Sequence, residues 1–305
     1  MGRNHARVTA NIRDVDVVLV VDPDERRARA LAEPAGARWA AVLPDRLDGI
    51  DTAAVATPTE FHRQHGIELM QAGVHVLMEK PLAPTLADAE ALVKAAAANR
   101  VVLMVGHVEQ FNTAVLELDR WVDGVVHVES ARVGPDSGRV QESVVFDLMI
   151  HDLDIVRRIV RSPLTRVHAT AQHARTATED LACALLCFEN GVTANLTASR
   201  IGQNKVRTLE ITQRANTVSV DLVQQTVMIR RMSQSEYLGD TDTVLRQSGV
   251  VEMPYLENRG EPLLLEIRHF FDCVKKGTPP RVSGEDGLET VRWALRVAEA
   301  AQAAC

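Results

Sequence analysis

The sequence predicts an α/β protein in which a doubly wound parallel sheet is followed by an α+β domain with a large, mainly antiparallel sheet. Two observations lead to this prediction. In the first third of the chain, short apolar runs alternate with helical segments, which is typical of parallel strands covered on both faces. From about Val125 onward, strand patterns are separated by turn residues instead, which favours antiparallel pairing. The 305 residues leave room for both parts, and we expect domains at 1–107 and 108–305.

The first domain is predicted from its apolar runs and from the residues that end them. Gly73 closes one helical segment, and Thr85 is the expected N-cap of the next. Another helical segment follows Gly2. The strands are expected within 15–24, 51–59, 74–81 and 101–107, and the two longer helices at 60–73 and 85–100. This alternation is the pattern of a Rossmann-like dinucleotide-binding domain.

The second domain is predicted from alternating strand patterns and a hairpin turn. Asn190-Gly191 lies between two such patterns and indicates a tight hairpin. The expected strands lie within 125–134, 165–174, 180–191, 192–200, 207–222 and 226–231, with helices at 145–160, at 262–276 and from 284 to the end.

Composition argues against several classes of protein. The net charge of −7 disfavours nucleic acid and anionic membranes as partners. No apolar run approaches the ~20 residues that span a bilayer, and the polar N-terminus has no signal-peptide core. The four cysteines form no CxxC pair and have no neighbouring histidine cluster, so we expect buried thiols and no metal site. We therefore expect a cytoplasmic protein.

Ligands of doubly wound sheets bind beyond the carboxyl ends of the parallel strands. Asp22 ends the first visible strand, where an acid hydrogen-bonds the ribose hydroxyls and favours NAD over NADP. The alternative is that Asp22-Pro23-Asp24 is simply a turn. The other residues at these ends are Thr57, Pro58, Thr59, Glu79, Lys80, Pro81, Gly106 and His107.

Lys80 follows an apolar strand and precedes a proline. A lysine beside a nicotinamide can hold a substrate hydroxyl and stabilise the alkoxide that forms as hydride leaves. A cis bond to Pro81 would fix its direction. The alternative is an ordinary solvated lysine.

The segment 145–160 predicts a buried helix with a narrow polar stripe. At 100° per residue, Asp147, His151, Asp154 and Arg158 share one side, and apolar residues fill the remainder. Asp147 and His151 are four residues apart, so the carboxylate can orient the imidazole as a general base. A structural ion-pair network explains the stripe equally well. Asp152 falls in the apolar arc, where we expect it to pair structurally or to bond backbone.

Six segments occur in an order that resembles the Gfo/Idh/MocA family of nicotinamide-dependent oxidoreductases. They are "TPTEFH", "AGVHVLMEKPL", "GHVEQFN", "DLMIHDLDI", "FENG" and "VSGEDGLETVRWALRVAEAA". The resemblance covers nearly the whole chain. Within the family, "GHVEQFN", "ARVGP" and "VVFDLMIHDLDI" most resemble the UDP-N-acetylglucosamine 3-dehydrogenase type.

The resemblance implies roles for individual residues. Lys80 matches the EKP lysine that contacts substrate, and Asp147 and His151 match a D-x-x-x-H pair whose histidine is the acid/base. Gln110 and Thr113 depart from a commoner Arg and Pro, which puts the identity of the substrate in doubt. The cofactor-side residues implied are Thr57, Pro58, Thr59, His62, Glu79 and Lys80.

Met1-Gly2-Arg3 matches the end of the family's G-x-G-x-M-G-R fingerprint. Gly2 and Arg3 are therefore expected at the cofactor, with Gly2 as the glycine that lets the helix pack closely on the sheet. The first strand and the first two glycines are missing from the pattern. We expect a misplaced gene start or a truncation.

The function expected is that of an NAD-dependent dehydrogenase acting on a secondary hydroxyl of a sugar or nucleotide sugar. His151 would accept the proton, Asp147 would orient it, and Lys80 would stabilise the alkoxide. The alternatives are a non-catalytic regulatory protein of the same fold, or an inositol or free-sugar substrate. Asn112, Arg132 and Arg139 are candidate substrate ligands, the arginines for a diphosphate. Surface arginines of a solvated sheet edge explain Arg132 and Arg139 equally well. The apolar strands predict a homodimer or homotetramer joined through the second sheet.

Overall fold

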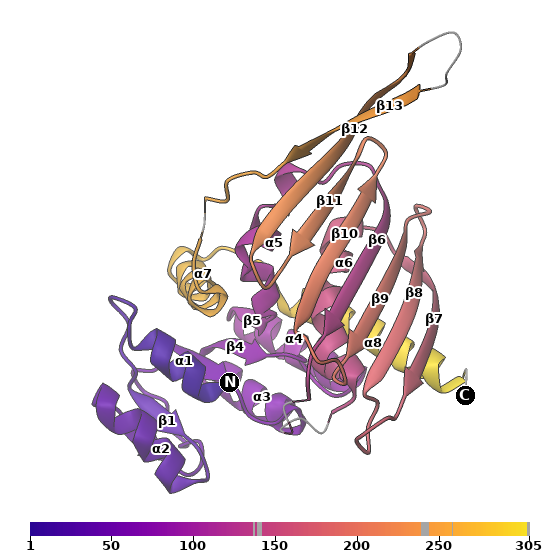
Figure 1. The fold of residues 1–305 in the computed structure, drawn as a ribbon. Coiled ribbons are helices and arrows are strands. Elements are labelled where there is room, and N and C mark those ends of the chain that lie inside the picture. Colours follow the sequence, from indigo (N-terminus) through magenta and orange to yellow (C-terminus); the bar gives the residue numbers. More distant parts are fainter. Residues whose placement is uncertain (137, 139–141, 239–243, 258, 304–305) are drawn as a thin grey trace. The chain divides into compact units, whose positions relative to one another are not determined.

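The structure is a computed structural model, and it describes residues 1–303 except 137, 139–141, 239–243 and 258. The chain forms two compact units (Figure 1). The first contains Met1–Phe111 together with Gly260–Arg292, and the second contains Asn112–Arg259 together with Trp293–Cys305. The segment 260–292 is therefore grouped with the first unit, although sequence order had assigned it to the second domain.

The first unit contains two parallel sheets. Strand β1 (Leu19–Val21) pairs with β2 (Arg38–Ala40), and β3 (Thr52–Val55), β4 (His75–Glu79) and β5 (Leu103–Gly106) pair in that order. Parallel pairing was predicted and is confirmed. Over the described residues, however, the strands form two separate sheets, because β1 and β3 do not pair with each other.

The helices of the first unit begin and end largely where their capping residues predict. Asp24 and Thr85 accept hydrogen bonds from the backbone N–H groups of Arg27 and Asp88, as N-caps do. Gly73 adopts φ 80° just after the helix that it was expected to close. The unit contains α1 (Gly2–Thr9), α2 (Glu25–Ala32), η1 (Glu33–Ala35), η2 (Thr59–Phe61), α3 (His62–Gln71), α4 (Leu86–Asn99), η3 (Val108–Phe111) and α7 (Pro262–Lys276).

Among the described residues, the second unit is built on eight strands in the order β13-β12-β11-β10-β6-β9-β8-β7 (Figure 1). Every neighbouring pair is antiparallel except β6 and β9, so the predicted, mainly antiparallel sheet is confirmed. The strands are β6 (Val125–Val133), β7 (Leu164–Gln172), β8 (Leu181–Phe188), β9 (Thr193–Ser199), β10 (Val206–Gln213), β11 (Asn216–Asp221), β12 (Thr226–Leu238) and β13 (Val244–Glu252).

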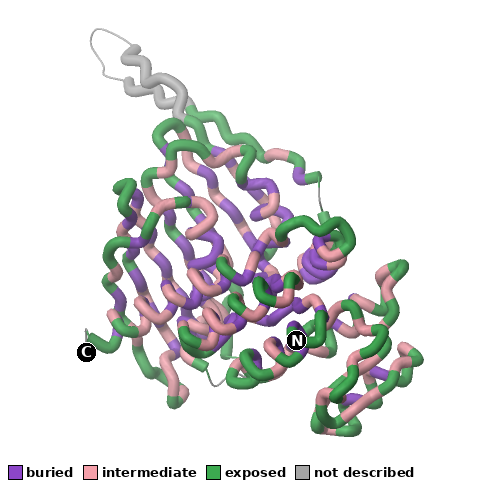
Figure 2. The backbone as a smooth tube through the Cα atoms, turned by 180° about the vertical axis from the view of Figure 1, so that it is seen from behind, coloured by how far each residue is buried: buried purple, intermediate pink, exposed green. Residues whose placement is uncertain are grey.

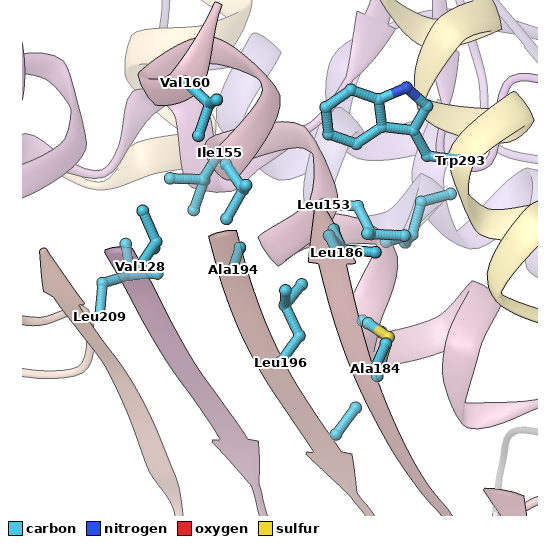
Figure 3. Packing of buried hydrophobic residues seen from close by; sticks show 14 of the residues in the cluster. Val128, Leu153, Ile155, Val160, Ala184, Leu186, Ala194, Leu196, Leu209 and Trp293 are labelled. Carbon is cyan, nitrogen blue, oxygen red and sulfur yellow. The ribbon is translucent and has the colours of Figure 1, made fainter. Parts of the chain in front are cut away.

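One face of this sheet is covered by helix α6 (Ile150–Val160) and by the end of α8 (Gly284–Ala303). Val128 and Leu196 point from the strands toward Leu153 and Ile155 on α6 (Figure 3). The Trp293 ring adds a contact with Phe188 at a centroid distance of 5.4 Å. Burial of these side chains supplies the main stabilising free energy of the unit. The remaining short helices are α5 (Thr113–Leu116), η4 (Leu118–Arg120) and η5 (Val145–Met149).

Burial alternates along the strands of the large sheet (Figure 2). On β8, Ala182, Ala184 and Leu186 are buried, while Leu185 between them is 41% exposed. Period-two alternation indicates a sheet with one covered and one open face. None of the described helices is long and apolar enough to cross a membrane.

Candidate active site

Lys80 lies directly after strand β4 and is half-buried. The Lys80–Pro81 peptide bond is cis. The residue before Lys80, Glu79, is 7% exposed, and its Oε1 lies 2.6 Å from Nε2 of His5 on α1. Glu79 is opposite Gly106 on β5, where an added Cβ would lie 3.3 Å from the Glu79 Cα. The absence of a side chain at Gly106 therefore leaves room beside the buried Glu79.

A third ionisable group, Glu266, is buried near this pair. It lies on α7, which packs against α1, and the residue is fully buried. Neither carboxyl oxygen has a hydrogen-bond partner among the described residues. Burial, and secondarily the nearby Glu79, raises the pKa of Glu266 well above its ordinary value. Sequence reasoning missed both His5 and Glu266, because each stands alone in its helix and carries no motif.

His62 does not point toward solvent. Its residue is 1% exposed, and both ring nitrogens face backbone carbonyls. Nε2 lies 3.0 Å from the Thr57 oxygen, and Nδ1 lies 3.0 Å from the Pro81 oxygen and 3.3 Å from that of Leu82. Burial lowers the pKa of His62, against the opposing effect of these carbonyls. The family resemblance placed His62 at the cofactor. That role stays a prediction, and in this structure the ring nitrogens lie against backbone oxygens.

The other cofactor-side candidates lie at strand ends or at the start of α1. Asp22 follows β1, and its Oδ1 accepts from the Asp24 N–H at 2.8 Å, which is turn chemistry that uses one carboxylate oxygen. Gly2 begins α1, and Arg3 beside it is exposed. An added Cβ at Gly2 would meet its nearest neighbour, the Ala56 Cβ, at 3.9 Å. A Cβ at this position would therefore make only an ordinary van der Waals contact, and the cofactor role of Gly2 stays a prediction.

Thr57, Pro58 and Thr59 form the segment that follows β3. Thr57 is half-buried and Pro58 is exposed, and the half-buried Thr59 opens the short helix η2. Their position beyond the carboxyl end of a parallel strand is the expected location for cofactor contacts.

In the second unit, Asp147 and His151 lie across a change of helix type. Residues Val145–Met149 form a π-helix, and α6 begins at Ile150. A π-helix has more residues per turn than an α-helix, so the 100° projection from Asp147 does not hold here. Both side chains are half-buried. Such π-segments occur frequently at functional sites.

The polar residues that follow on α6 are paired within the unit. Asp152 binds Arg132, as its place in the apolar arc predicted. Asp154 is fully buried and lies 3.6 Å from the Arg157 guanidinium, while Arg158 pairs with the exposed Asp119. This part of the stripe is a structural network.

Two of the three candidate substrate ligands, Arg132 and Asn112, make hydrogen bonds within the second unit. The Arg132 guanidinium is 2% exposed and donates to both carboxylate oxygens of Asp152, at 3.0 and 2.8 Å. The Asn112 side chain caps α5 by accepting from the Ala114 N–H, and it donates to the Leu222 oxygen. Both side chains are thus engaged within the second unit, and their role as substrate ligands stays a prediction. Arg139 lies outside the described residues. Among the residues that the structure describes, no cluster of three metal-ligating side chains is present.

Comparison with known proteins shows what the chain is similar to. Residues 1–107 match the model of an oxidoreductase family with an NAD-binding Rossmann fold, and residues 87–218 match the GFO/IDH/MocA C-terminal domain. The chain is also 30% identical over 305 residues to UDP-N-acetylglucosamine 3-dehydrogenase of Acidithiobacillus ferrooxidans, covering 99% of this chain and 95% of that protein. The chain belongs to the Gfo/Idh/MocA family.

Other known dehydrogenases are similar to this chain in sequence or in structure. The myo-inositol 2-dehydrogenase of Thermotoga maritima is 26% identical, covering 94% of this chain and 89% of that protein. A solved structure of the Acidithiobacillus ferrooxidans enzyme aligns at TM-score 0.87 and 29% identity, covering 99% of this chain and 95% of that one. Levoglucosan dehydrogenase in complex with NADH and levoglucosan aligns at TM-score 0.82 with 18% identity, covering 99% and 95%, which shows the fold alone. The chain is therefore an NAD-dependent oxidoreductase.

Proposed function

We propose that this chain oxidises a secondary hydroxyl of a sugar, with a nucleotide sugar preferred, and reduces NAD. The main support is the 30% identity over nearly the whole chain to a nucleotide-sugar dehydrogenase. Lys80, Asp147 and His151 stand at the positions that the family motifs predict. The relatives named above are all dehydrogenases, so no observation favours the binding-only alternative.

In the proposed mechanism, NAD held by the first unit would supply the acceptor for the hydride of the substrate carbon. The His151 imidazole accepts the hydroxyl proton, and Asp147, four residues earlier, orients the ring and stabilises its charged form. The Lys80 ammonium group donates to the substrate oxygen, where negative charge develops. The half-buried position of all three side chains leaves them reachable while limiting competition from water.

The residues present fit the chemistry of NAD. The Asp22 carboxylate follows a parallel strand and uses one oxygen in its turn, which suits hydrogen bonds to ribose hydroxyls. The N–H groups of Gly2 and Arg3 lie in the first turn of α1, where backbone donors lack acceptors within the helix and suit a phosphate. Thr57, Pro58, Thr59 and Glu79 are proposed near the nicotinamide side.

The test of the activity is NADH formation by the purified chain with UDP-N-acetylglucosamine, UDP-glucose, free N-acetylglucosamine and myo-inositol. We expect the UDP-sugars to be turned over best. His151→Ala and Lys80→Met should lose turnover while retaining NAD binding by calorimetry. Lys94→Met, on the exposed surface of α4, is the matched control for the lysine. Unchanged turnover in His151→Ala would contradict the proposed base, and faster turnover of myo-inositol would contradict the substrate class.

We also propose a homo-oligomer that joins copies through the open face of the large sheet. Cys183 and Cys187 of β8 lie on that face, half-buried, on either side of the more exposed Leu185. A face of small and apolar side chains is stabilised when a second copy covers it. Light scattering should give at least a dimer, which Leu185→Arg should dissociate and Val42→Arg, an exposed site in the first unit, should not. A monomeric parent protein would contradict this.

A cytoplasmic location is part of the same proposal. Cys183, Cys187 and Cys273 are free thiols in the structure, which suits a reducing compartment. Fractionation of the producing cell tests the location directly, and recovery of the protein outside the cytoplasmic fraction would contradict it.

A further inference from the structure

The segment that carries Lys80 is bound by a buried histidine on each side. Before it, the Glu79 side chain is held by His5 Nε2 at 2.6 Å. After it, the Pro81 carbonyl is held by His62 Nδ1 at 3.0 Å. His5 is 4% exposed and His62 is 1% exposed, so neither ring is available to a ligand.

The two histidines that contact this segment come from different helices. His5 belongs to α1 and His62 begins α3. His62 Nε2 also lies 3.0 Å from the Thr57 oxygen, so the ring lies between the segment after β3 and the segment after β4, and its single N–H in the neutral form donates to one of them. Buried polar contacts of this kind are strong positional constraints, because breaking either one leaves a buried polar group unsatisfied.

We propose that His5 and His62 are positioning residues that together fix Lys80 relative to the Thr57–Thr59 segment. The inference rests on the proposed role of Lys80, but the geometry that it invokes does not. Lys80 has a long, flexible side chain, and a displaced backbone would move its ammonium group by more than a reacting geometry tolerates. Two buried anchors flanking a single residue remove that freedom.

Loss of a positioning histidine has different consequences from loss of an ordinary core histidine. A structural histidine would affect the stability of the whole protein, and its loss would alter many lysines equally. Loss of a positioning histidine instead changes the reactivity of Lys80 selectively. This loss also lowers kcat.

The experiment compares His5→Leu and His62→Leu, which remove the anchors, with His5→Gln and His62→Gln, which keep one amide donor each. Each folded variant is labelled with an amine-reactive reagent, and the modification rates of Lys80 and Lys94 are followed by mass spectrometry. We expect the leucine variants to change Lys80 labelling severalfold with Lys94 unchanged, and the glutamine variants to show a smaller change of the same sign. In turnover with a UDP-sugar, kcat should fall by about tenfold or more in the leucine variants.

Unchanged Lys80 labelling in the folded variants overturns the proposal, and so does an equal change at Lys80 and Lys94. If a leucine variant does not fold, its glutamine counterpart decides by the same criterion. Because the labelling needs no substrate, a parent protein that turns over no sugar would refute the proposed function and leave this test intact. Altered labelling with kcat unchanged would show that Lys80 moves without consequence, which also overturns the positioning role.

Discussion

Arg132 on β6 and Asp152 on α6 form a bidentate ion pair with both side chains 2% exposed. The pair joins the sheet of the second unit to the helix that carries His151. Two charges taken out of water are costly unless each satisfies the other, and the parallel N–H···O contacts of an arginine fork achieve this. The pair therefore specifies how α6 lies on the sheet.

Replacing one partner of this pair should be far more damaging than replacing both. Arg132→Leu leaves the Asp152 carboxylate buried without its cation, and we expect a loss of about 3–5 kcal/mol in the free energy of unfolding. The double variant Arg132→Leu/Asp152→Leu should recover part of that loss. Urea denaturation measures both. Arg231→Leu, which breaks the half-exposed pair with Glu252, is the control and should cost less than about 1 kcal/mol. Equal costs at the two sites would contradict the assignment.

Glu266→Gln should raise the stability of the protein increasingly as the pH rises. Burial raises the pKa of Glu266 in the folded state above its ordinary 4.5, so the folded state retains a proton that the unfolded state releases. Stability is thus lost from about pH 4.5 upward until the folded pKa is reached, by at most about 1.4 kcal/mol per pH unit. Glutamine removes this loss. Urea midpoints from pH 4 to 8 measure it, with the exposed Glu299→Gln as control. A pH-independent difference would contradict the interpretation.

Gly66→Ala should destabilise the first unit although it adds only one methyl group. A Cβ at Gly66 would lie 2.5 Å from Leu92 Cδ2 and 2.7 Å from Met78 Cε, so these two buried side chains would have to move. We expect a loss of about 1–3 kcal/mol, measured by denaturation. Leu92→Val, which removes the nearest atom, should partly restore the double variant. Gly2→Ala has space for its methyl and should change stability by less than about 0.5 kcal/mol.

Asp22→Ser should shift the cofactor preference toward NADP if Asp22 contacts the ribose as proposed. Loss of the carboxylate removes both a hydroxyl partner and the repulsion of a 2′-phosphate, so the ratio of kcat/KM for NAD over NADP should fall by about tenfold or more. Asp24→Ser, two residues from Asp22, is the matched control. Asp24 is the N-cap of α2, and serine can take over this capping role. An unchanged ratio in Asp22→Ser would leave Asp22 as a turn residue only.

Local rules predicted the elements that carry strong patterns. Thr85 before an alanine-rich run marked the start of α4, and Asn190-Gly191 marked the β8–β9 hairpin, where Gly191 adopts φ 83°. Sequence reasoning missed α2, β2 and β13. The first is rich in arginine, and β2 has only three residues, so neither shows the periodicity that burial of one face produces.

The candidate site could be proposed from sequence where its residues stand in motifs, as Lys80, Asp147 and His151 do. Contacts between positions far apart along the chain could not be predicted, such as Arg132 with Asp152 and Asn112 with Leu222. No spacing rule connects such positions.

The sequence by itself determined the class of the fold, the family and the residues that could carry chemistry, because periodicity, capping and motifs are local properties of the chain. Only the tertiary structure decided which polar side chains are committed to the interior. His62 and His5 became anchors of the Lys80 segment because distant backbone and carboxylate groups reach them where water does not. A polar group in the interior must find a partner, and which partner it finds depends on how elements remote in sequence are brought together.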